Sequence, residues 1–201
     1  SDMELRGCLG LVPTQSEANG AIERAMQQHL RQMARNNAWA NETLFGAVCA
    51  LSDTALLTQR PSFFGTLPRL LNHIYEIDLY YLDAAQQGGR GRSVFERTDV
   101  ADMVELAGLQ AVQDRALIDF CDGLTAQMLA THVPTERPDG ITSEALGRLL
   151  LHVFQHQVHH RGQAHGMLSQ AGVNPPQLDD FFLEYGRVPS AERYWEEMHD
   201  A

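Results

Sequence analysis

The segment His152-Val-Phe-Gln-His156-Gln-Val-His159-His160-Arg161-Gly-Gln163 holds four of the chain's nine histidines and lies within a long helical pattern. Successive residues of a helix are about 100° apart, so His156 and His160 lie about 40° apart around the axis and one turn apart along it. Two imidazoles at positions i and i+4 can bind one transition-metal ion, as the histidines of an HExxH helix do. The segment therefore predicts both a helix and half of a metal site.

The limits of this helix follow from its flanking residues. Thr142 or Ser143 is suited to the N-cap, and the helix is expected to run to about Ala171. Gly172 then occupies the position after the C-cap that favours glycine, and Pro175 follows as a stop.

Apolar residues at helical spacing predict three further long helices, and the shorter pieces are read from local sequence. No segment shows a convincing strand pattern, and residues 134–140 are expected to form a loop. The sequence thus predicts an all-α four-helix bundle with short extra C-terminal helices. Residues 1–20 are expected to be an irregular arm, and residues 21–201 a single bundle domain. The expected helices cover residues 21–51, 66–88, 100–121 and 142–171, with shorter ones at 125–130, 178–185 and 190–199.

The composition restricts the partners. With 15 basic and 26 acidic residues among 201, the formal net charge is −11, which argues against nucleic acid or an anionic membrane as partner. The three cysteines show no CxxC spacing, so neither a thiolate zinc site nor a disulfide framework is indicated. No apolar run is long enough to span a membrane and no secretory signal is recognised, so a cytoplasmic protein acting on a small-molecule substrate is expected.

A metal site with an open position needs a third protein ligand. His73 is the best candidate, because it lies in the middle of another predicted helix near an apolar face. A core histidine bonded to a backbone carbonyl is an equally good interpretation of His73 from sequence alone. His152 and His159 remain alternative ligands, because each lies within about 60° of His156 on the helix surface.

Three neighbouring side chains differ in their expected relation to the site. Gln163 projects to nearly the same face as His156 and is expected to orient an imidazole or bind a water ligand. Glu76 could accept a hydrogen bond from a ligand histidine or act as a general base, although a place on a solvated helix face is the favoured interpretation. Arg161 points away from the site, and an ion pair with Asp78 or Asp180 is expected.

Three motifs occur in a recognisable order. Asn37-Ala-Trp39-Ala-Asn41 lies in the first long helix, Leu71-Asn72-His73-Ile74 in the second, and His156-Gln-Val-His159-His160-Arg161-Gly162-Gln163 in the last. Over residues 25–185, the chain resembles the DinB/YfiT family of proposed metal-dependent enzymes. The HxxxHRGQ motif is the most specific part of this resemblance.

The resemblance implies an up-down-down-up four-helix bundle with a divalent metal bound by His73, His156 and His160. Zinc and nickel are the metals that it favours, and a low-molecular-weight thiol is the cofactor that some related enzymes use. It also suggests a homodimer. The implied function is a thiol-dependent S-transferase or isomerase. The alternatives are a metal-dependent hydrolase, a stress-associated metal-binding protein without catalysis, and an interaction module with structural histidines.

Overall fold

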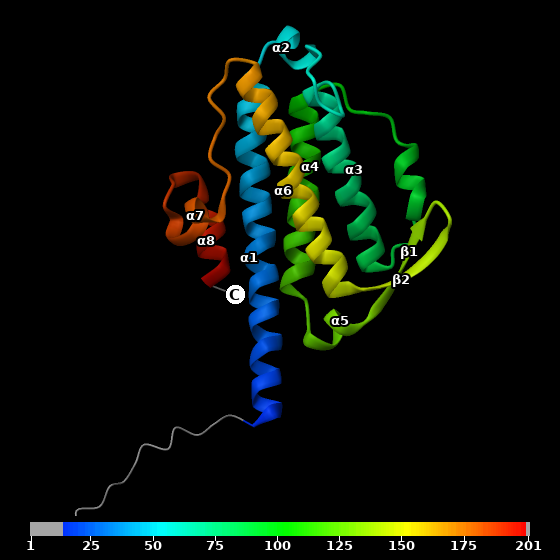
Figure 1. Ribbon diagram of the computed structural model, residues 1–201. Helices are drawn as coiled ribbons and strands as arrows, with labels where there is room; N and C mark the ends of the chain where they lie inside the picture. Colours follow the sequence, from blue (N-terminus) through cyan, green and yellow to red (C-terminus); the bar gives the residue numbers. More distant parts are fainter. Residues whose placement is uncertain (1–13, 200–201) are drawn as a thin grey trace, which may run out of the picture.

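The computed structural model describes residues 14–199, and it is mostly helical with one small two-stranded sheet (Figure 1). Within this range no helix is both long and apolar enough to cross a membrane. The elements are α1 (Gln15–Cys49), α2 (Asp53–Leu57), α3 (Leu67–Gln86), η1 (Gly91–Glu96), α4 (Met103–Asp122), α5 (Ala126–Ala130), β1 (His132–Arg137), β2 (Gly140–Ala145), α6 (Leu146–Gln170), α7 (Asp180–Leu183), η2 (Glu184–Gly186), η3 (Pro189–Ala191) and α8 (Glu192–His199).

Helix α1 begins six residues earlier than the sequence predicts. Thr14 is its N-cap, and the Thr14 and Glu17 side chains form a reciprocal capping box with each other's backbone N–H groups. This motif satisfies two backbone donors that otherwise lack partners at a helix start. Residues 15–20, which were assigned to the irregular arm, are therefore helical, whereas residues 1–13 of that arm lie outside the described range.

The β1–β2 hairpin corrects the expectation that strands are absent. The two strands are antiparallel, and His132 pairs with Ala145 while Arg137 pairs with Gly140. Strand β1 alternates in burial, with Val133 and Thr135 turned inward. Residues 134–140, predicted as a loop, therefore supply most of β1 and its turn.

The hairpin also moves the start of the last long helix. Thr142 and Ser143, the predicted N-cap candidates, lie within β2, and α6 begins at Leu146 after an N-cap at Ala145. Helix α4 likewise begins a few residues later than predicted, because the Asp102 side chain caps it by accepting from the Val104 and Glu105 N–H groups.

The four long helices pack around a shared core (Figure 1). Helix α1 contacts α4 and α6, and α3 contacts the same two helices. Aliphatic side chains fill the space between them in two large clusters of buried residues. A third cluster joins Trp39 and Ala40 of α1 to Leu183 and Ala191, so the short C-terminal helices cover one side of α1. The arrangement leaves α3 and α6 directly side by side along the face that carries the histidines.

Candidate metal centre

His73, His156 and His160 come together between α3 and α6. One ring nitrogen from each histidine lies within 4.8 Å of the others, and Nε2 of His73 is 3.2 Å from Nε2 of His156. Two nitrogen ligands bound tetrahedrally to one zinc ion at about 2.05 Å would be about 3.3 Å apart. The spacing of this pair therefore fits shared coordination, and no backbone carbonyl needs to be invoked for His73.

Helices α3 and α6 fix the positions of these three imidazoles along the bundle axis. His73 lies about two turns from the start of α3, and His156 and His160 occupy successive turns of α6. The Phe64 ring lies over the group, with its centroid 4.7 Å from that of His73 and 5.4 Å from that of His160. An aromatic ring at this position restricts the imidazoles and removes part of their hydration.

Burial keeps the three imidazoles neutral. It lowers the pKa of His73 to about 4, with the nearby His160 as a smaller cause. It also lowers the pKa of His156 to about 3, again with neighbouring histidines adding to the effect. The pKa of His160 is lowered by burial as well, although its hydrogen bond to Gln163 opposes this shift. Neutral imidazole is the form that binds a metal ion, so the group is ready to bind at neutral pH.

Gln163 fixes which nitrogen of His160 faces the centre. Gln163 Oε1 lies 2.8 Å from His160 Nδ1, and Gln163 Nε2 lies 3.1 Å from His159 Nε2. Because an amide oxygen only accepts, His160 Nδ1 must carry the proton, and its Nε2 is left free for a ligand. The predicted contact of Gln163 with an imidazole is therefore present. His159 stands outside the group as the exposed partner of Gln163.

The other candidate residues lie around the centre or away from it. His152 packs its ring 5.1 Å from Tyr81 and 6.2 Å from His156, and it is not part of the group of three. Glu76 is half-buried, and burial raises its pKa while the charge of Arg97 opposes the change. The charged neighbours of Glu76 are thus Arg97 and Asp99 and not the histidines. No contact between Glu76 and the three histidines supports its predicted role as a general base.

Arg161 is fully buried, but its partners differ from the prediction. It donates to the side-chain oxygens of Asn37, Asn41 and Gln157 rather than to a carboxylate. Burial lowers the pKa of Arg161 to about 10, a change that the charges of Asp114 and Asp78 oppose. The amides come from two places: Asn37 and Asn41 lie on the neighbouring α1, and Gln157 precedes Arg161 by one turn on α6.

These residues belong to a polar core network that joins all four long helices. Its members are Asn37 and Asn41 of α1, Asp78 of α3, Gln110 and Asp114 of α4, and Gln157 and Arg161 of α6. Gln157 and Arg161 each follow a candidate ligand directly in sequence, so the network lies behind the histidines. Sequence motifs include Asn37, Asn41 and Arg161 of this network. No sequence pattern indicated its two members on α4, Gln110 and Asp114.

The comparison with known proteins assigns the family. The DinB family model matches residues 26–196, which is most of the chain. The chain belongs to the DinB family. The protein DinB of Bacillus subtilis (strain 168) is 25% identical over 150 residues, which cover 71% of this chain and 86% of that protein.

The match to the DinB family includes every part of the centre described above. It begins within α1 and ends within α8, so the polar core network and the three histidines all lie inside it. The resemblance inferred from the three sequence motifs is thereby confirmed at the level of the family.

Proposed function

We propose that the chain binds a divalent transition-metal ion, zinc or nickel, through His73, His156 and His160. One observation supports this most directly: three imidazoles, two of them with strongly lowered pKa values, present nitrogens within 4.8 Å of one another. Three neutral ligands fit an ion that keeps a further position for water or substrate. An ion there would lower the pKa of a bound water or thiol and so supply a nucleophile at neutral pH.

We further propose a metal-dependent enzyme that transfers a low-molecular-weight thiol or catalyses a related isomerisation. Three neutral ligands leave the charge of the ion uncompensated, which favours an anionic fourth ligand. Neither described cysteine belongs to the group: Cys49 lies at the end of α1, and Cys121 is buried in the α4 core. The thiol would then come from a small molecule. Water in the same position would instead make the protein a hydrolase.

Metal retention tests the first proposal. Purified protein is expected to hold about one equivalent of zinc or nickel, which elemental analysis measures after gel filtration. His160→Ala is expected to abolish retention, and the neighbouring His159→Ala to preserve it. If His159→Ala lost the metal and His160→Ala kept it, the ligand set would be wrong. If neither variant nor the native protein held metal, the histidines would be structural.

A thiol screen tests the second proposal. Zinc-, nickel- and manganese-loaded protein is offered glutathione, bacillithiol or mycothiol together with an electrophile, either a chlorinated aromatic compound or maleylpyruvate. Consumption of thiol that requires the metal and disappears in His156→Ala supports an enzyme. Retention of metal without turnover of any thiol would favour the hydrolase or the non-catalytic metal-binding protein.

The finer architecture is also a proposal. We propose an up-down-down-up bundle, which is supported by the course of the chain through α1, α3, α4 and α6 in Figure 1. We also propose a homodimer, which is supported by exposed apolar side chains near the C-terminus such as Phe181. Light scattering should give twice the chain mass of 22.4 kDa, and the mass of a single chain at micromolar concentration would reject the dimer.

A further inference from the structure

A pocket of about 440 Å³ lies between α1 and α4, on a different pair of helices from the three histidines. Its size is within the range of small-molecule sites. Apolar side chains of the two long helices line most of it, including those of Ala38, Phe45, Ala107 and Ile118. Residues of α8 complete the wall.

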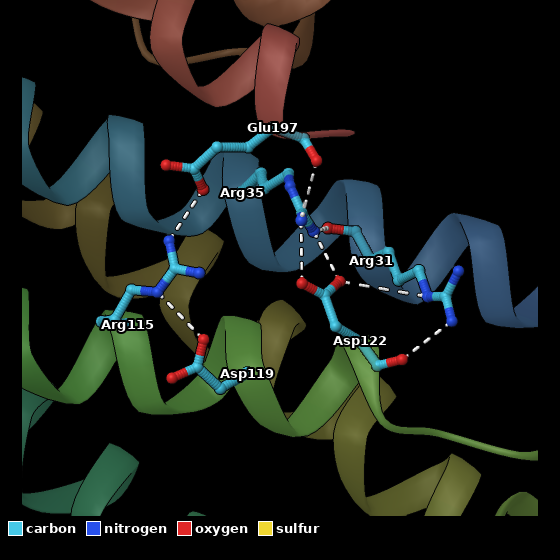
Figure 2. Close-up of polar contacts among 6 residues, drawn as sticks. All are labelled: Arg31, Arg35, Arg115, Asp119, Asp122 and Glu197. Carbon is cyan, nitrogen blue, oxygen red and sulfur yellow. Dashed lines mark hydrogen bonds and ion pairs between the residues drawn. The ribbon is translucent and has the colours of Figure 1, made fainter. Parts of the chain in front are cut away.

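The end of α8 is attached to α1 and α4 by charged groups (Figure 2). Arg115 of α4 donates to the Glu197 carboxylate at 2.7 Å, and Arg35 of α1 donates to the Glu197 carbonyl at 3.4 Å. Arg35 is itself held by Asp122 in a two-pronged contact of 2.8 and 2.9 Å. These contacts fix α8 in place as one wall of the pocket.

The charged groups at the rim already have partners. Arg193 and the Tyr194 hydroxyl both donate to the Glu42 carboxylate, and Arg115 pairs with Glu197 as described. A ligand with a net charge would have to compete with these contacts. The rim therefore favours a neutral molecule.

The buried end of the pocket carries an acceptor without a partner. Gln110 is 1% exposed, and its Nε2 donates to Asp78 Oδ2 at 2.8 Å and to Asp114 Oδ1 at 3.0 Å. Two acceptor oxygens on the nitrogen side, Asp78 Oδ2 and Asp114 Oδ1, fix the orientation of the amide, so its oxygen points away from them. That oxygen, Oε1, is buried and makes no hydrogen bond. A buried acceptor left unpaired is costly, and a ligand that donates to it removes this cost.

We propose that this pocket binds a small neutral carboxamide, whose N–H donates to Gln110 Oε1 and whose apolar body lies against the Phe45 and Ile118 side chains. The neighbouring Asp114 makes an amide preferable to a simple alcohol. Burial and the charge of Asp78 raise the pKa of Asp114 to about 8, so the carboxyl is mainly protonated at neutral pH. Asp114 Oδ1 already accepts from Asn37, Asn41 and Gln110, whereas Oδ2 accepts one longer contact, 3.2 Å from Asn41 Nδ2. The proton is therefore assigned to Oδ2, which can donate it in a hydrogen bond to the amide oxygen.

Two helical glycines give a matched pair of variants. Gly46 lines the pocket, Gly108 of α4 does not, and a Cβ built on either one meets no atom within 4 Å. Both are exposed, so Gly46→Phe fills the pocket and Gly108→Phe adds the same ring elsewhere without disturbing the core. Thermal unfolding of both variants checks that the fold is retained.

The probes are 2-naphthamide and its N,N-dimethyl derivative, which has the same apolar body but no N–H. Calorimetry on the full chain should give submillimolar binding of 2-naphthamide to the native protein, to Gly108→Phe and to His160→Ala. We expect binding at least about 10-fold weaker in Gly46→Phe, and at least about 5-fold weaker for the dimethyl derivative, the factor that one lost hydrogen bond represents.

Several outcomes would overturn the proposal. Unchanged binding in Gly46→Phe would place the compound elsewhere, and loss of binding in His160→Ala would place it at the histidines. Equal affinity for the two amides would remove Gln110 Oε1 as the recognition group. Failure of 2-naphthamide to bind the folded native protein at millimolar concentration would reject the pocket as a carboxamide site.

Discussion

At the scale of single residues, the candidate metal centre depends on how each imidazole is oriented as much as on where it lies. Gln163 leaves Nε2 of His160 free for a ligand, because its amide oxygen accepts a hydrogen bond from the Nδ1–H of the same ring. Partners of this kind outside the ligands raise metal affinity, because they prevent the ring from rotating away.

Replacing Gln163 should therefore weaken metal binding without removing a ligand. We expect Gln163→Leu to lower zinc affinity about 10- to 100-fold. Competition with a chromophoric chelator measures the affinity. Gln155→Leu makes the same change at an exposed position of α6 and should leave the affinity unchanged. An equal loss in both variants would show a general effect on the helix.

The lowered pKa values of His73 and His156 predict the pH dependence of binding. Ordinary histidines have a pKa of about 6.5, so three of them would lose about 1,000-fold in metal affinity between pH 7.5 and 5.5 through competition with protons. With pKa values of about 4 and 3, His73 and His156 stay neutral over this range. Only His160, whose pKa is also lowered, then competes with protons over this range. The measured loss of metal affinity should therefore be less than about 10-fold, the loss expected from one ordinary histidine. A loss near 1,000-fold in folded protein would contradict this.

At the scale of elements, helical periodicity accounts for what the sequence could predict. The spacing of His156, His160 and Gln163 on one helix requires only the helical pitch. The hairpin was missed because its second strand, from Gly140 to Ala145, is largely exposed and shows no apolar alternation. The partners of Arg161 were missed for another reason. They depend on how α1 and α6 are rotated about their axes relative to each other, which no local sequence pattern records.

The hairpin turn makes a prediction that can be checked against a helical glycine. Gly140 has a φ of 135°, a region that residues with a side chain rarely adopt. We expect Gly140→Ala to lower the free energy of unfolding by about 1 kcal/mol or more. Gly108→Ala, in an exposed and unobstructed position of α4, should raise it by up to about 1 kcal/mol. Urea denaturation measures both, and a stabilised Gly140→Ala would disprove the assigned turn.

At the scale of the whole molecule, the polar core network links stability to pH. Burial raises the pKa of Asp78 to about 6, and burial together with the Asp78 charge raises that of Asp114 to about 8. An unfolded aspartate has a pKa of about 3.9. Between these values the folded chain binds more protons than the unfolded chain, so the stability contributed by the buried carboxyls falls as pH rises.

Asp114→Asn should remove most of this dependence. The amide is neutral at every pH and has nearly the same shape as the protonated carboxyl. We expect the native protein to lose stability relative to Asp114→Asn as pH rises from about 4 to about 8, as measured by urea denaturation at several pH values. Asp180→Asn, at an exposed position of α7, serves as control and should run parallel to the native protein. Parallel curves for all three proteins would show that Asp114 is ionised throughout.

The polar core network also limits how far the helices can slide along one another. Rows of leucine and valine allow a shift by one turn, because one aliphatic side chain then replaces another in the same gap. Arg161 can bond to Asn37 and Asn41 in only one axial alignment of α6 against α1. A shift of α6 by one turn would leave the guanidinium facing aliphatic side chains. An unpaired buried charge costs several kcal/mol, enough to depopulate such misaligned forms during assembly. The seven side chains of the polar core network thus determine the axial alignment of α1, α3, α4 and α6.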